Sequence, residues 1–310
     1  MRFGMFTFCR APFDELVRLW RAAEDLGFDS AWVDDDLLSP GYGDFEPWTL
    51  LAALARESTR LQLGTLVSVI TFRQPAFLAA QVLTLDHISH GRAALGLGSG
   101  GPENPYGAFG LREWSPRERA QRLEEQAVVL DSLLRGESMT WEGIYYSVQN
   151  ANPPTPVQRP RPPFIIAAHG DRGLRLAARY ADGWNSLGGQ PYRLARDPSK
   201  RVALGVAVAQ TRRLSERLDE HCRQLRRDAA TLRRTVLAYW PVPDPLASVD
   251  AFDEYVGRYR EIGIDELVFY WPPLDNIRTA SPVSAEQWAR FEHIATECIL
   301  GNRKRAQPTS

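Results

Sequence analysis

Apolar residues fall in eight short runs of strand length, and the stretches that separate most of them have amphipathic, helix-like spacing. Short apolar runs with turn residues on either side predict buried strands. The predicted strands are Arg2–Phe6, Ser30–Asp34, Leu61–Val67, Arg92–Gly98, Phe164–Ala168, Asp182–Leu187, Arg234–Trp240 and Glu266–Trp271.

The amphipathic stretches predict a helix after every strand. The clearest start signals are Ser115–Glu118 and Ser284–Gln287, because a serine cap followed three residues later by Glu or Gln satisfies the first free N–H groups of a helix. Gly27 supplies a stop after the first helix. The predicted helices are Phe13–Leu26, Pro47–Ser58, Gln74–Ile88, Ser115–Leu134, Arg172–Tyr180, Thr211–Ala230, Ser248–Ile262 and Ser284–Leu300.

Strict alternation of strand and helix implies parallel strands with right-handed crossovers. Eight such units within 310 residues fit a closed barrel better than an open sheet, so the predicted fold is α/β, a (β/α)8 TIM barrel. A hairpin at Trp141–Ser147 and a proline-rich strap up to Pro163 form an insertion between the fourth and fifth units. We expect one barrel domain over residues 1–300 and a polar tail over 301–310.

Charge and composition argue against several classes of function. The 37 basic and 38 acidic side chains give a net charge of −1, which argues against a nucleic-acid or anionic-membrane binder. No run of about 18 apolar residues predicts a membrane span. The segment Met1–Asp14 does not look like a signal peptide, so we expect a cytoplasmic protein.

Metal and dinucleotide sites are not predicted. Cys9, Cys222 and Cys298 are widely spaced, and no Cys/His cluster has ligand spacing. The segment Gly96–Gly101 matches GxGxxG, but Pro102 follows at once and the next helix waits until Ser115. A dinucleotide fingerprint needs its third glycine to open a helix, so this match is weak.

Several motifs then occur in a familiar order. They are Ala31–Leu38 (AWVDDDLL), Leu63–Val67 (LGTLV), Phe72–Pro75 (FRQP), Leu85–Arg92 (LDHISHGR), Leu95–Gly100 (LGLGSG), Glu142–Tyr146 (EGIYY) with the strap, and Ala177–Trp184 (AARYADGW). In order and spacing the chain resembles the bacterial luciferase-like monooxygenase family from Arg2 to about Gly189. Beyond that point only the strand–helix rhythm and Ile262–Leu267 support the resemblance.

The resemblance implies an oxidoreductase or monooxygenase that holds reduced FMN or the deazaflavin coenzyme F420 at the C-terminal mouth of the barrel. Its chemistry would be hydride transfer or oxygen activation on a small-molecule substrate. Motif matching does not separate FMN from F420. The resemblance also leaves open a separate flavin reductase as a partner, and a homodimer.

Candidate residues lie where strands end, because catalytic groups of such barrels occupy the C-terminal face. The resemblance assigns Asp35 to the cofactor and places Asp36 where the family usually has a histidine near the ring, which makes Asp36 a catalytic candidate. In the alternative, these aspartates only cap the next segment. The resemblance further predicts a cis peptide at Leu66–Val67, against the cofactor ring.

The next two strand ends are rich in small residues. Gly98, Ser99 and Gly100 would let the backbone approach a ring or phosphate, and Glu103 is a second catalytic candidate. Ala168, His169 and Gly170 precede a helix start that would hold a phosphate, with Arg172 adding charge. The alternatives are a plain turn at the first site and a surface cap at the second.

Aromatic residues end the last three strands. Trp184, Trp240 and Trp271, accompanied by Tyr239 and Tyr270, could form an apolar wall, so we expect an apolar or aromatic substrate. The alternative is ordinary core. The loops Leu38–Glu46, Gly101–Trp114 and Ser186–Val202 would close over the mouth. Two other functions stay open: a non-catalytic flavin- or deazaflavin-binding homologue, and a barrel hydrolase or isomerase that uses the aspartates.

Overall fold

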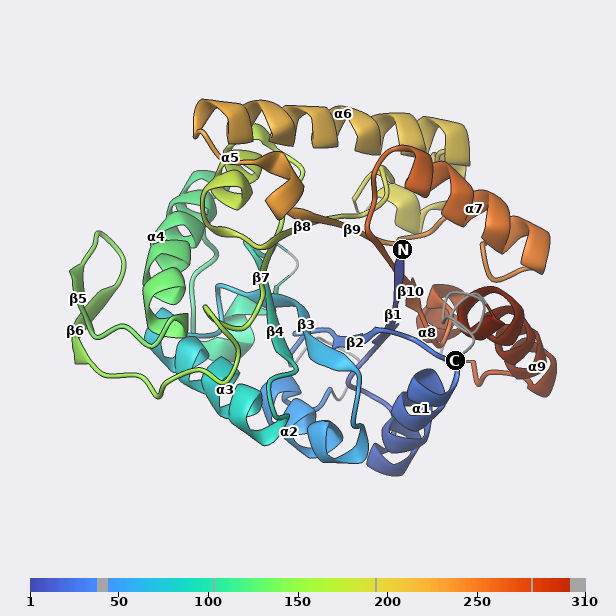
Figure 1. The fold of residues 1–310 in the computed structure, drawn as a ribbon, viewed down its shortest axis with the longest axis horizontal. Coiled ribbons are helices and arrows are strands. Elements are labelled where there is room, and N and C mark those ends of the chain that lie inside the picture. The colour runs from blue at the N-terminus through green and yellow to red at the C-terminus, as the bar shows by residue number, and fades with distance from the viewer. Residues whose placement is uncertain (38–43, 103, 193, 280, 302–310) are drawn as a thin grey trace, which may run out of the picture.

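The computed structural model describes residues 1–37, 44–102, 104–192, 194–279 and 281–301. Parallel strands close into a barrel in the order β1-β10-β9-β8-β7-β4-β3-β2, so the predicted fold is confirmed (Figure 1). The strands are β1 (Arg2–Thr7), β2 (Ser30–Val33), β3 (Gln62–Val69), β4 (Ala93–Gly98), β7 (Phe164–Ala167), β8 (Gly183–Ser186), β9 (Arg233–Leu237) and β10 (Glu266–Tyr270).

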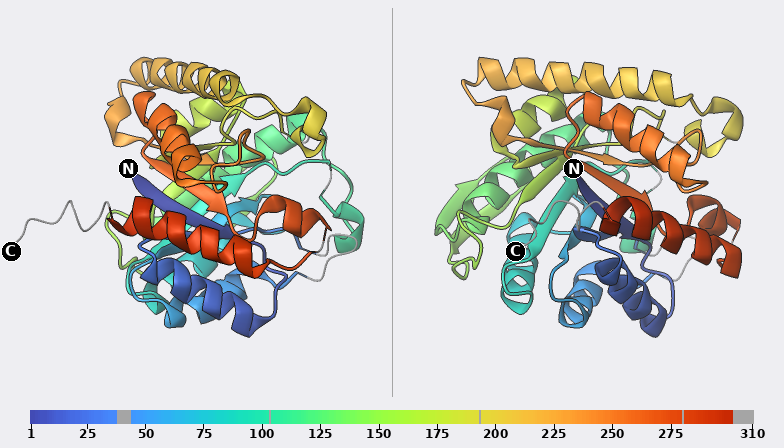
Figure 2. Two further views of the ribbon diagram at one scale, coloured as in Figure 1. Left: turned by 90° about the vertical axis from the view of Figure 1, so that its right-hand side faces the viewer. Right: turned by 45° about the vertical axis from the view of Figure 1, so that its right-hand side comes forward.

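Helices surround the barrel, and the longer ones bury apolar side chains in a layer against the strands (Figures 1 and 2). Both serine start signals are confirmed: Ser115 Oγ accepts the N–H of Glu118, and Ser284 forms a full capping box with Gln287. The helices are α1 (Phe13–Asp25), α2 (Pro47–Glu57), α3 (Pro75–Ile88), α4 (Pro116–Leu134), α5 (Asp171–Tyr180), α6 (Leu204–Gln224), α7 (Val249–Glu261), α8 (Leu274–Thr279) and α9 (Ala285–Ile294), the last continued by a π-helical turn to Leu300.

The insertion between β4 and β7 is confirmed. The antiparallel hairpin of β5 (Met139–Glu142) and β6 (Ser147–Ala151) projects from the barrel beyond α4 (Figure 1). The proline-rich strap then returns to the barrel, where the buried guanidinium of Arg161 pairs with Asp182 and donates to the carbonyl of Tyr180 at 2.8 Å. Because an arginine can bind several acceptors at once, one side chain fixes the strap to the start of β8.

Side chains alternate between two apolar layers along each strand. On β10, Phe269 packs outward in the layer under the helices, whereas Val268 and Tyr270 point into the barrel. The interior layer also contains Trp32 and Leu66. Burying one large apolar side chain contributes roughly 1.5–3 kcal/mol, so both layers stabilise the barrel strongly.

Two elements depart from the sequence prediction. Helix α6 begins at Leu204 rather than Thr211, because Leu204, Ala207 and Val208 extend its buried face. It ends at Gln224 rather than Ala230, just before Arg226 takes a left-handed φ of +55°. The short helix α8 was not predicted. The predicted tail falls almost entirely outside the described residues, and no described helix is long and apolar enough to cross a membrane.

Candidate active site

The C-terminal strand ends form two facing walls. In the closed order of strands, β7, β4 and β3 are neighbours, and β8, β9, β10 and β1 are neighbours on the other side. The first group carries the small-residue wall, defined as Leu66, Val67, Gly98–Gly100 and Ala168–Gly170. The second group carries the aromatic wall, defined as Phe6, Phe8, Tyr192, Tyr239, Trp240 and Tyr270. Strand β2, which precedes Asp36, lies between them.

The small-residue wall depends on close packing between β3 and β4. The Leu66–Val67 peptide is cis, as predicted. A Cβ atom added at Gly98 would lie 2.5 Å from Val67 Cγ2, so only glycine lets the two strands approach here. Ser99 and Gly100 are half-buried beyond it. The result is a surface of backbone and small side chains.

The β7 end continues this wall to a helix start. Ala168 is buried, His169 and Gly170 are exposed, and Gly170 is the N-cap of α5. A Cβ at Gly170 would meet no atom within 4 Å, which leaves room for a ligand. The first N–H groups of a helix have no acceptor within it and carry the positive end of its dipole, so this rim can receive an anion.

Arg172 does not join that rim. Its guanidinium pairs with Glu124 of α4 on the outer surface, so the predicted phosphate contact is not supported by its position. The side chain of Asp171 also faces away from the mouth, because it accepts from Arg217 Nε at 2.7 Å and lies 2.9 Å from His221 Nε2. Of the residues predicted to bind a phosphate, only the backbone at the start of α5 and His169 lie at the rim of the mouth.

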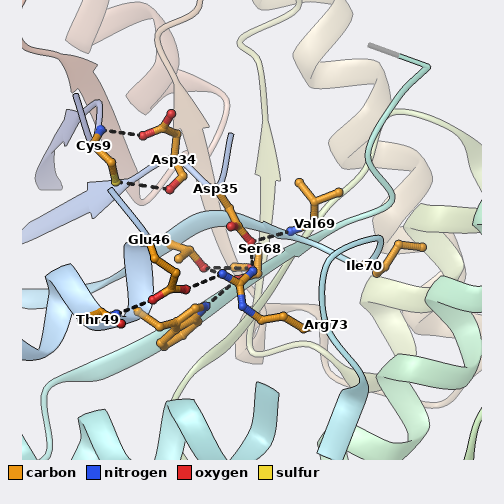
Figure 3. A network of polar contacts seen from close by, with 12 residues as sticks. Cys9, Asp34, Asp35, Glu46, Thr49, Ser68, Val69, Ile70 and Arg73 are labelled. Atoms are coloured by element: carbon orange, nitrogen blue, oxygen red, sulfur yellow. Dashed lines mark hydrogen bonds and ion pairs between the residues drawn. The ribbon is translucent and has the colours of Figure 1, made fainter. Parts of the chain in front are cut away.

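Two buried carboxylates follow β2 (Figure 3). Asp34 Oδ1 accepts the backbone N–H of Cys9 at 2.9 Å, and its Oδ2 lies 3.7 Å from Arg10 Nη2. Burial raises the pKa of Asp34 to about 7, and the nearby Asp44 adds to this shift. The carboxylate therefore ties the loop after β1 to the end of β2.

Asp35 is locked on the other side of the same strand end (Figure 3). Its carboxylate pairs with the buried guanidinium of Arg73 and accepts the N–H of Val69 at 3.2 Å, while Arg73 also binds Glu46 at 2.6 Å. Burial raises the pKa of Asp35, although Arg73 opposes this shift. Asp35 therefore fixes the β2 end against β3, and its predicted contact with a cofactor stays a prediction.

Asp36, in contrast, is exposed at the mouth. Partial burial and the neighbouring Tyr239 raise the pKa of the Tyr192 phenol, and the charge of the nearby Asp36 adds to this shift. Asp36 thus lies where the small-residue wall meets the aromatic wall.

The aromatic wall consists of two groups of ring contacts. The ring centroid of Tyr270 lies 4.7 Å from that of Phe6 and 5.7 Å from that of Phe8. Tyr239 lies 6.1 Å from Tyr192 and 6.4 Å from Trp240. Such contacts hold the rings as one apolar surface with polar hydroxyl groups.

Trp240 belongs to this wall, as the sequence predicts. Its φ is +45°, a left-handed value that few bulky residues adopt, and the guanidinium of Arg201 lies 4.1 Å from the ring centroid. Residues held in such a conformation are concentrated at functional sites. A small cavity of about 100 Å³ lies beside the ring, between the ends of β9 and β10.

Trp184 and Trp271 point the other way. Trp184 is buried under the helices, where Nε1 donates to the carbonyl of Ala168 at 2.8 Å. The Trp271 ring stacks on Phe291 of α9 at 4.0 Å. Neither ring lies in the aromatic wall, because neighbouring side chains on a strand alternate between the interior and the helix layer.

A model of the luciferase-like monooxygenase family matches residues 1–240. The chain belongs to this family. It is 31% identical over 332 residues to an F420-dependent glucose-6-phosphate dehydrogenase of Beutenbergia cavernae, which covers 93% of each protein. It is 35% identical over 192 residues to the protein of the same name from Amycolatopsis mediterranei, and that match covers 59% of this chain and little more than half of the relative, 56%.

A solved structure of similar fold is the coenzyme F420-dependent tetrahydromethanopterin reductase of Methanopyrus kandleri. The TM-score is 0.75 at 17% identity, with 97% of this chain and 99% of that chain covered. At this identity the likeness shows the luciferase-like fold and no more.

Of the two predicted catalytic residues of this luciferase-like barrel, the structure describes Asp36 but not Glu103. Asp36 occupies the position where the resemblance expects a histidine, and the structure leaves its side chain exposed at the mouth. Glu103 lies outside the described residues, as does most of the predicted lid Leu38–Glu46. The roles of both carboxylates stay predictions.

Sequence reasoning missed part of the aromatic wall of this luciferase-like barrel. Phe6 and Phe8 end the first strand, and Tyr192 belongs to a loop. A period of two along Phe6 and Phe8 was a usable signal, since both can face the same side. No sequence signal marks Tyr192, because its position near Tyr239 depends on the path of the loop that carries it.

Proposed function

We propose that the protein is an F420-dependent oxidoreductase that transfers a hydride between the deazaflavin and the alcohol or carbonyl carbon of a mainly apolar or aromatic substrate. The observation that carries the proposal is the division of the barrel mouth into a small-residue wall and a facing aromatic wall. The choice of F420 over FMN rests on relatives that are named F420-dependent dehydrogenases.

The residues fit such a cofactor. The surface of Leu66, Val67 and Gly98 has no Cβ at Gly98, where one would collide with Val67, so the backbone is open to the approach of a fused ring. The open rim at Gly170 and the start of α5 would hold the phosphate. When bound, the deazaflavin supplies or accepts the hydride, and the protein supplies binding, orientation and the exclusion of water.

Asp36 is the proposed proton acceptor or donor. It is the exposed member of the three consecutive aspartates, and it lies at the border between the two walls. Alcohol oxidation must remove the hydroxyl proton when the hydride leaves carbon, and a positioned carboxylate at that border can hold it. Asp34 and Asp35 keep the Asp36 backbone in place through Cys9, Arg73 and Val69.

The substrate class follows from the aromatic wall. Phe6, Phe8 and Tyr270 offer ring faces to whatever lies between the walls. An apolar body with one reacting oxygen fits this surface, because buried aromatic faces favour apolar contact and leave few polar partners. The proposed substrate therefore differs from the glucose 6-phosphate in the name of the relatives.

Hydride transfer from different alcohols tests the proposal. Purified protein is mixed anaerobically with oxidised F420 and either 1-phenylethanol or glucose 6-phosphate, and loss of the oxidised cofactor's absorbance is followed. We expect kcat/KM at least about tenfold higher for the aromatic alcohol, equivalent to about 1.4 kcal/mol. Preferred oxidation of glucose 6-phosphate contradicts the substrate class. Bound cofactor that no alcohol reduces, and reduced cofactor that no ketone oxidises, would indicate a non-catalytic binding homologue.

A further inference from the structure

Two phenols in the aromatic wall have no assigned task. Tyr239 and Tyr270 are 8% and 9% exposed. Neither hydroxyl forms a hydrogen bond with another described residue, and neither is sealed from the surface as the unpartnered Tyr106 hydroxyl is. The buried Tyr259, by contrast, donates to the carbonyl of Gly188 at 2.7 Å. The hydroxyls of Tyr239 and Tyr270 therefore both reach the surface with no described protein partner, so each can donate to a molecule that enters the mouth.

Strand pairing places these two tyrosines on neighbouring strand ends. Leu237 of β9 pairs with Val268 of β10, both side chains face the interior, and Tyr239 and Tyr270 each follow two residues later. The two phenols are also close electrostatically. Burial raises the pKa of Tyr270 well above its ordinary value, and Tyr239 contributes to the same shift. Tyr270 therefore stays protonated at physiological pH, which makes it a hydrogen-bond donor rather than a base.

The pair faces the small-residue wall. Among the barrel's strands, β9 is four positions from β3, which carries Leu66–Val67, and β10 is four positions from β4, which ends at Gly98. Four positions in a ring of eight is the opposite side. A molecule between the walls would have the small-residue surface on one side and two phenol O–H groups on the other.

We propose that the hydroxyls of Tyr239 and Tyr270 form a two-donor site that binds the reacting oxygen of an alcohol or ketone. The inference rests on the proposed function and adds the groups that hold this oxygen. Two O–H donors stabilise the negative charge that builds on a carbonyl oxygen when a hydride reaches its carbon. The surrounding Phe6, Phe8 and Trp240 keep the rings fixed and exclude water.

The test compares two probes that differ only in the oxygen. Acetophenone and ethylbenzene are titrated into the full-length protein without cofactor, with tryptophan fluorescence as the readout, for wild type, Tyr239→Phe, Tyr270→Phe and the double variant. The matched control is Tyr180→Phe, which removes a half-buried phenol at the C-terminal end of α5, outside the aromatic wall. We expect wild type and control to prefer acetophenone, each single variant to lose about three- to tenfold of that preference, and ethylbenzene affinity to stay constant.

Several outcomes would overturn the site. Equal affinity of wild type for the two probes, no saturable binding of acetophenone, or a preference that survives in the double variant each removes the two-donor assignment. A parallel titration with F420 separates this inference from the proposed function. If F420 fails to bind while the phenol-dependent preference persists, the proposed function is wrong and the oxygen site stands. If F420 binds and the preference ignores the phenols, only the oxygen site is wrong.

Discussion

Asp34, Asp35 and Asp36 carry the same functional group in three different environments. Asp34 is buried beside Cys9, Asp35 is buried against Arg73, and Asp36 is exposed. The sequence predicts a cofactor contact for Asp35 and a catalytic role for Asp36, but it does not predict which of the three carboxylates is buried, because burial depends on the direction in which the chain leaves β2. The two buried carboxylates position the strand end, and the exposed one is the residue to which proton transfer is proposed.

Replacing Asp36 tests its proposed proton transfer. We expect Asp36→Asn to lower kcat at least about tenfold, because the amide cannot take up the substrate proton, while the affinity for F420 changes less than about twofold. Steady-state kinetics and a fluorescence titration of F420 measure the two effects. Asp253→Asn, an exposed change on α7, is the control. Undiminished turnover in Asp36→Asn would remove this carboxylate from the mechanism.

Asp34 predicts a pH dependence of stability. Its pKa is about 7 in the folded protein, whereas an aspartate in an unfolded chain titrates near about 3.9. Between these values the folded state binds more protons, so the free energy of unfolding contributed by Asp34 falls as pH rises from about 4 to about 7 and is constant above. A full shift of this size corresponds to at most about 4 kcal/mol.

Asp34→Asn should abolish that loss, because the amide oxygen can still accept the Cys9 N–H without becoming charged. We expect urea unfolding to show a flatter stability profile from pH 4 to 7, and a more stable variant at pH 8. Asp253→Asn should keep the wild-type profile. A variant that is less stable than wild type at pH 8 would show that the ionised Asp34 stabilises the fold through Arg10, the opposite of the sign argued here.

At the scale of elements, apolar spacing and capping residues predict where strands and helices lie, but they do not predict which way individual side chains point. The caps at Ser115 and Ser284 placed two helix starts correctly because capping is a contact between neighbours in sequence. The sequence predicts Trp184 and Trp271 at the mouth, but both side chains lie in the layer under the helices. Successive side chains on a strand point to opposite faces, so an error of one residue in the pattern places a side chain on the wrong face. The direction of the Arg172 side chain has no local signal either, because the guanidinium pairs with Glu124, which lies 48 residues earlier.

At the scale of the whole molecule, strand order turns a list of strand ends into a site. Leu66–Val67, Gly98 and Gly170 are far apart in sequence, but β3, β4 and β7 are neighbours and carry one wall. The sequence could predict the barrel, and with it that all eight ends meet at one mouth. It could not predict that Phe8 and Tyr192 complete the opposite wall, because their contacts join segments far apart in the chain.

The central claim is that this mouth accepts a deazaflavin. The direct measurement is an anaerobic fluorescence titration of the wild-type protein with F420 and with FMN, each oxidised and reduced. The account predicts saturable F420 binding with a Kd at least about tenfold lower than that for FMN. Absence of saturable F420 binding, or FMN binding of equal or greater affinity, would contradict it.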